Sequence, residues 1–111
     1  ITLNKDKNLL TLTFDNISYP LSTEFLRVYS PSAEVVGHGP GQETLQLDKE
    51  NVKINRIEPT GNYAIILFFD DGHDSGIYSW SHLHKLATNK DSLWSNYLKR
   101  LKEAGHSHSK L

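Results

Sequence analysis

Histidine is the residue type in this sequence best suited to metal or acid–base chemistry, because the chain has six histidines and no cysteine. Without a thiol, the chain cannot form a disulfide, hold zinc or an iron–sulfur cluster by thiolates, or use a cysteine nucleophile. His82 and His84 are two residues apart on a predicted helix, so their side chains point in nearly opposite directions and cannot share one ion. Two more histidines lie near the C-terminus, in a segment that we expect to fray. His38 and His73 remain as candidates for a metal or ligand site.

The usual catalytic motifs are missing from the sequence. It has no G-x-S-x-G elbow, no H-E-x-x-H zinc motif and no H-x-D or H-x-E pair for iron. The glycine-rich loop Gly37-His38-Gly39-Pro40-Gly41 lacks the Lys-Ser/Thr ending of a phosphate-binding loop, and Pro40 removes one backbone donor. The aspartates between residues 70 and 74 do not have the spacing of an EF-hand. We therefore expect both segments to form turns.

Composition and length limit the classes of function. The 111 residues suffice for one domain, which we expect to cover residues 1–105, followed by a flexible tail at 106–111. With 12 basic and 13 acidic residues, the net charge of −1 gives no basic patch for nucleic acid or an anionic membrane. The apolar runs are also too short for a membrane span. Because a cysteine-free chain fits a reducing compartment, we expect a cytoplasmic protein.

The segment between residues 9 and 31 is predicted to form two strands and a short helix. Apolar and polar residues alternate over 9–14, which is typical of a half-buried strand, and Asp15-Asn16 favours a turn into a second strand. Ser22 is a predicted N-cap of a short helix. Pro31 ends that helix, because the residue before a proline avoids helical geometry.

The second half of the sequence repeats this order. A strand begins at Val52 with a predicted kink near Asn55-Arg56, and the apolar run 63–69 predicts a central strand covered on both faces. After the turn at 70–73 and a short return strand, Ser79 is the predicted cap of a helix. A last helix should start near residue 89 and close at Gly105. The predicted fold is therefore α+β, a small, mainly antiparallel sheet built from two strand-turn-strand-helix units, with a C-terminal helix.

Five stretches of the sequence together resemble a known family. They are Leu26-Arg27, Ser30-Pro31-Ser32-Ala33-Glu34, the glycine-rich loop 37–41, Gly61-Asn62-Tyr63-Ala64 and the segment 71–80. Together they resemble the gamma-butyrobetaine hydroxylase-like N-terminal domain, and the resemblance covers nearly the whole chain. Free-standing bacterial members of that family are known as a domain of unknown function. In the eukaryotic hydroxylase, the module precedes a separate iron- and 2-oxoglutarate-dependent catalytic domain, which could not fit in the residues available here.

The resemblance also implies a change at a metal site. The hydroxylase module holds a structural zinc through three cysteines and one histidine, and His73 matches that histidine. The cysteine positions fall at Ser30, Ser32 and near Val35. Neither serine nor valine replaces a thiolate as a zinc ligand at neutral pH. We therefore expect no zinc, with a remnant of His38 and His73 as the fallback, and we expect hydrogen bonds and packing to join the helix end to the turn.

Two functions follow from these observations as hypotheses. The first is a non-catalytic accessory module without a cofactor, which binds another protein or its own copy. Related modules are fused to iron–sulfur-carrier ATPases, so a role in iron–sulfur cluster handling is one specialisation. The alternative is a small-molecule or metal-binding protein, or an enzyme, with a site around His38 and His73. The residues predicted for the interaction or binding surface are Arg27, His38, Asp71, His73, Tyr78 and Trp80.

Overall fold

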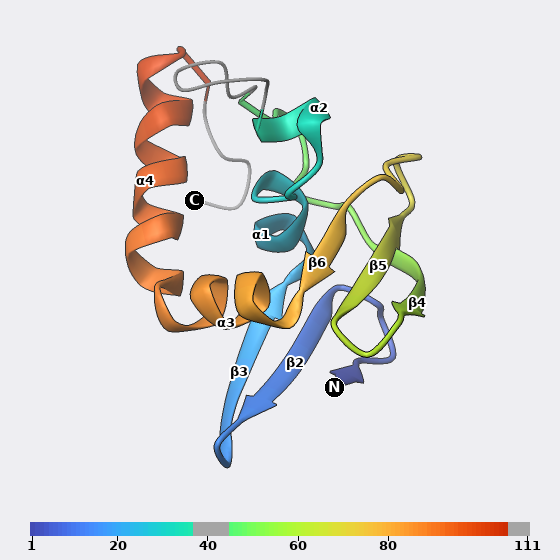
Figure 1. The fold of residues 1–111 in the computed structure, drawn as a ribbon. Coiled ribbons are helices and arrows are strands. Elements are labelled where there is room, and N and C mark those ends of the chain that lie inside the picture. The colour runs from blue at the N-terminus through green and yellow to red at the C-terminus, as the bar shows by residue number, and fades with distance from the viewer. Residues whose placement is uncertain (37–44, 107–111) are drawn as a thin grey trace.

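Two three-stranded antiparallel sheets and four helices make up the part of the chain that the computed structural model describes, residues 1–36 and 45–106 (Figure 1). The strand orders are β1–β2–β3 and β4–β5–β6. The predicted α+β class and antiparallel pairing are confirmed, with the strands divided between two sheets. The strands are β1 (Thr2–Leu3), β2 (Leu9–Phe14), β3 (Ile17–Ser22), β4 (Ile54–Thr60), β5 (Ala64–Phe69) and β6 (Ile77–Ser79), and the helices are α1 (Thr23–Val28), α2 (Ala33–Val36), α3 (Trp80–Thr88) and α4 (Lys90–Glu103).

The two predicted strand-turn-strand-helix units are both present, as β2–β3–α1 and β5–β6–α3. In the first, Asp15 and Asn16 both adopt positive φ, as a two-residue hairpin turn of the primed type requires. Each helix then starts at the predicted serine, because Ser22 Oγ accepts the N–H of Phe25 and Ser79 Oγ accepts the N–H of His82. The hydroxyl acceptors satisfy N–H groups that a helix start would otherwise leave without a partner.

The second sheet also follows the sequence closely. The register of β4 against β5 shifts between Ile54 and Arg56, which is the predicted kink. β4 continues through Thr60, and the turn occupies residues 61–63. β5 is the central strand, as predicted. The prediction that both of its faces are covered is wrong, because Ile66 and Phe68 on the outer face are only half-buried.

The main core lies between the two sheets and helices α1 and α3, with α4 along one side of the molecule (Figure 1). A smaller core joins the end of α1 to α4, where Val28 packs with Tyr97 and Leu101. Gly105 ends α4 with a positive φ, as predicted, and His106 N–H bonds back to the carbonyl of Leu101. The core side chains shared by the two sheets, α1 and α3 are Leu10, Leu12, Leu21, Phe25, Leu26, Val52, Ile54, Ile65, Leu67, Phe69, Tyr78, Leu83, Leu86 and Ala87.

Among the described residues, no helix is both long and apolar enough to cross a membrane.

Candidate functional site

The end of α1 and the turn between β5 and β6 meet at His73. This side chain is only 4% exposed, and its Nε2 lies 2.8 Å from the hydroxyl oxygen of the fully buried Ser30. A second pair of side chains joins the same two segments, because Ser32 Oγ lies 2.7 Å from Ser75 Oγ. The predicted hydrogen-bonded connection between helix end and turn is therefore confirmed. Ser30 and Ser32 are two of the positions that the resemblance assigns to zinc-binding cysteines, and here both hydroxyls bond to residues of the turn.

A glycine allows this close approach. A Cβ atom placed on Gly76 would lie 2.6 Å from Ser30 Oγ and 3.0 Å from the ring of Tyr78, both closer than ordinary contacts. Gly76 therefore lets the strand that follows the turn pass directly against the end of α1. The hydroxyl of Tyr78 donates to the carbonyl of Leu26 at 2.5 Å, so α1 is attached to β6 at a second point.

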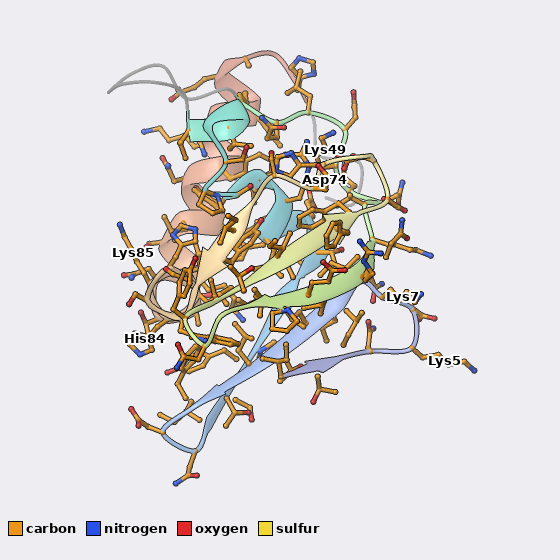
Figure 2. All side chains as sticks on the ribbon, turned by 45° about the vertical axis from the view of Figure 1, so that its right-hand side comes forward. Lys5, Lys7, Lys49, Asp74, His84 and Lys85 are labelled. Carbon is orange, nitrogen blue, oxygen red and sulfur yellow. The ribbon has the colours of Figure 1, made fainter. Side chains whose placement is uncertain are left out.

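A buried arginine binds the same turn. Arg27 is only 7% exposed, and its Nε donates to Asp71 Oδ2 at 2.9 Å while its Nη1 donates to Gln46 Oε1 at 3.0 Å. Lys49 Nζ lies 2.7 Å from the same Asp71 oxygen, and the other oxygen accepts the backbone N–H of His73. Figure 2 shows the labelled Lys49 at the end of the molecule where this turn lies. Arg27 and Asp71, two of the residues predicted for the binding surface, therefore lie together beside His73.

The ionised form of Asp71 is stabilised by these partners. Burial alone would raise the pKa of this carboxyl group. The hydrogen bonds from Lys49 and from the His73 backbone, together with the charge and hydrogen bond of Arg27, outweigh burial and lower the pKa to about 2. The group is therefore an acceptor with a fixed negative charge near neutral pH, and it does not have the raised pKa of a general acid.

The remaining predicted surface residues differ in their burial. Tyr78 is fully buried, and burial raises the pKa of its hydroxyl. Together with Arg27 and His73, it belongs to the interior, so these three do not form a contact surface. Trp80 is half-buried and lies at the other end of β6, where its Nε1 donates to the Asn62 carbonyl. His38 lies outside the described residues.

The other histidines of the helices point apart, as predicted. His82 Nε2 lies 3.2 Å from the carbonyl oxygen of Tyr29, and desolvation by burial lowers the pKa of the His82 ring. His84 is exposed and packs edge-on against Phe14. Over residues 1–36 and 45–106, no group of three or more His, Asp or Glu side chains could hold a metal ion.

Sequence reasoning missed Lys49 as a partner of Asp71 and Gln46 as a partner of Arg27, because both come from the segment before β4 that has no periodic pattern. It also missed the outer face of the second sheet. In the strand register, Arg56 pairs with Phe68, and Glu58 pairs with Ile66, which in turn pairs with Ile77. We call these five residues the open sheet face. Ile66 and Phe68 of the run 63–69 carried the signal, but periodicity cannot say whether a second layer covers them.

Comparisons with known proteins agree with this fold. The family model described as gamma-butyrobetaine hydroxylase-like, N-terminal, matches residues 1–84. Two solution NMR structures are of proteins that are 53% identical to this chain, and each match spans 96% of this chain. The first match spans 85% of the other protein with a TM-score of 0.85, and the second spans 80% with a TM-score of 0.79. A crystal structure of a protein of unknown function from Acidithiobacillus ferrooxidans, of the DUF971 family, is 31% identical. The matched region spans 78% of this chain and 86% of the Acidithiobacillus ferrooxidans protein, with a TM-score of 0.60. No curated protein matches. The chain belongs to the family of gamma-butyrobetaine hydroxylase-like N-terminal domains.

Proposed function

We propose that this protein is a non-catalytic accessory module that binds another protein through the open sheet face. The single observation that carries the proposal is the exposure of apolar side chains on one side of β4–β5–β6. Ile77 is 49% exposed, and Ile66 and Phe68 beside it are half-buried. Adjacent apolar side chains of this kind on a sheet mark protein contact sites more often than isolated ones do.

Charged side chains border this apolar strip. The guanidinium carbon of Arg56 lies 4.2 Å above the centre of the Phe68 ring, and Arg56 Nε lies 3.2 Å from Glu58 Oε1. Both charged side chains are about half exposed or more, so their ion pair contributes little to folding. An apolar centre with a polar rim is the usual anatomy of a protein interface, and arginine is enriched there.

The absence of a catalytic role is part of the same proposal. The groups best suited to chemistry, Arg27, Asp71 and His73, hydrogen-bond to other residues of the chain, and Arg27 and His73 are buried. A catalytic site needs such groups to face a substrate in a concave pocket. We also propose that the junction of α1 and the turn works without zinc, since serine hydroxyls take the place of thiolates there.

The family resemblance directs the choice of partner and compartment. Related modules are fused to iron–sulfur-carrier ATPases, and a carrier of that type in the cytoplasm is the first partner to test. The cysteine-free chain would support the carrier without holding the cluster by thiolates.

The experiment compares two exposed isoleucines. Ile77 lies on the open sheet face, and Ile17, 55% exposed, lies at the β2–β3 turn and serves as the matched control. Proteins cross-linked to the wild-type domain in cells are identified, purified and titrated against wild type, Ile77→Lys and Ile17→Lys by calorimetry. We expect Ile77→Lys to weaken binding at least about tenfold and Ile17→Lys to change it less than about twofold.

Circular dichroism and urea unfolding verify that both variants are folded. Equal affinities for the two variants would contradict the role of the sheet face. Failure to find any protein that binds the purified domain, together with a monomer in sedimentation, would contradict the interaction hypothesis as a whole.

A further inference from the structure

A groove beside β3 and the first turn of α4 has the composition of a small-molecule site. Its volume is about 400 Å³, and it lies away from the open sheet face and from the Asp71 turn. Pockets for small ligands are typically about 300–1,000 Å³, mostly apolar, with few polar groups. The proposed protein-interaction function does not involve this groove.

Aromatic rings form much of the lining. Phe25 and Trp94 lie with their ring centres 6.4 Å apart and their planes at 66°, and Leu9 and Pro20 complete the apolar part. Phe25 is buried in the core, whereas Trp94 is only half-buried. An aromatic ring entering the groove can therefore contact the indole of Trp94, a contact that is favourable beyond simple burial of area.

One cation, Lys90, lines the groove. Lys90 Nζ lies 3.4 Å from the carbonyl oxygen of Pro20, which is longer than an ordinary hydrogen bond and involves a neutral acceptor. No carboxylate within the described ranges forms an ion pair with Lys90. The ammonium group is thus available for a stronger, charge-assisted hydrogen bond to an anion.

Two further polar groups restrict the anion. Asp91 also lines the groove, and its negative charge beside Lys90 disfavours a ligand with a second negative charge. Ser22 Oγ already accepts the N–H of Phe25, so its hydroxyl hydrogen is the part that can donate to a ligand. Ser22 therefore favours an acceptor group on the ligand, and Asp91 disfavours more than one negative charge on it.

We propose that this groove binds a small aromatic monocarboxylate, with the ring against Trp94 and the carboxylate at Lys90 Nζ. The apolar lining provides the binding energy, and the lysine provides the preference for an acid over its neutral analogue. The inference requires no chemical step, because the groove holds no nucleophile paired with a base among its lining residues.

The test uses phenylacetate as the probe and the fluorescence of Trp94 as the readout. The chain has two tryptophans, so the Trp80→Phe variant leaves Trp94 as the single tryptophan. In that background we expect phenylacetate to change the emission of Trp94 saturably, and phenylacetamide, its neutral analogue, to bind about tenfold more weakly. Acetate, which lacks the ring, should produce no saturable change.

Charge variants assign the carboxylate to Lys90. Lys90→Met should weaken phenylacetate binding about tenfold, whereas Lys90→Arg, which keeps the charge, should change it less than about threefold. Lys85→Met is the matched control, because Lys85 is an exposed residue of the neighbouring helix α3 (Figure 2). The inference is overturned if phenylacetate does not saturate below about 10 mM, a weaker affinity than a specific small-ligand site needs. It is equally overturned if Lys90→Met binds phenylacetate as wild type does.

Discussion

Replacing Asp71 with asparagine tests the network that fastens the β5–β6 turn to α1. The substitution keeps the size of the side chain but removes the charge that Arg27 and Lys49 contact at 2.9 and 2.7 Å. The lowering of the Asp71 pKa from 3.8 to about 2 corresponds to at most about 2.4 kcal/mol of folding free energy. Water reaches this carboxylate and screens it, so we expect a loss of about 1 kcal/mol near neutral pH.

The pH dependence of this loss has a definite sign. The folded pKa is below the unfolded one, so the ionised carboxylate stabilises the folded state fully above about pH 4. That contribution is lost as the pH falls through the folded pKa of about 2, because below this pH the wild-type side chain is also neutral. The difference in stability between wild type and Asp71→Asn should therefore shrink from about 1 kcal/mol at pH 6 towards zero near pH 2.

Urea unfolding followed by circular dichroism at pH 6, 4, 3 and about 2 measures this difference. Asp74→Asn is the control, because Asp74 is an exposed carboxylate of the same turn, labelled in Figure 2. We expect this control to change the free energy of unfolding by less than about 0.5 kcal/mol. A difference between Asp71→Asn and wild type that is the same at pH 6 and pH 2 would refute the argument, as would an equal effect of Asp74→Asn.

Three other substitutions test contacts of the same junction and of α4. Ser30→Ala removes the 2.8 Å partner of buried His73 Nε2 and should lower the free energy of unfolding by about 1–3 kcal/mol in urea titrations. Gly76→Ala should cost about 1–3 kcal/mol, and less in the Ser30→Ala background, since the added Cβ lies 2.6 Å from Ser30 Oγ; a double-mutant cycle measures the difference. Tyr97→Phe removes the 2.9 Å bond to the Gln46 carbonyl and should cost about 0.5–1.5 kcal/mol in thermal unfolding.

The hairpins and helix starts could be predicted because each depends on neighbouring residues. Asp15-Asn16 tolerates the positive φ of the turn, Ser22 and Ser79 supply cap oxygens, and Gly105 accepts the left-handed conformation at the end of α4. Such local signals act within a few residues, so a single sequence contains all that they require. The division of the strands into two sheets depends on contacts between distant residues, so no short stretch of the sequence indicates it.

The candidate site was predictable only in part for the same reason. Arg27 and Asp71 are 44 positions apart, and their ion pair forms only once α1 packs against the β5–β6 turn. Residue type identified both as candidates, but it could not show that Arg27 is buried. A buried arginine must pair with an acceptor, because an isolated charge in the interior is costly. The pair therefore serves the fold, and the contact surface that we propose lies elsewhere, on β4–β5–β6.

The junction that a metal would organise in a zinc-binding relative is held here by side-chain hydrogen bonds. Ser30 bonds to His73, Ser32 bonds to Ser75, and Arg27 bonds to Asp71, so three separate contacts cross between the helix end and the turn. A chelator should therefore leave the urea midpoint of the purified protein unchanged, and elemental analysis should find less than about 0.1 zinc per chain, since tight structural sites are filled stoichiometrically. A midpoint that falls on adding EDTA and recovers with zinc would contradict this reasoning, because metal binding to a folded site stabilises it by mass action.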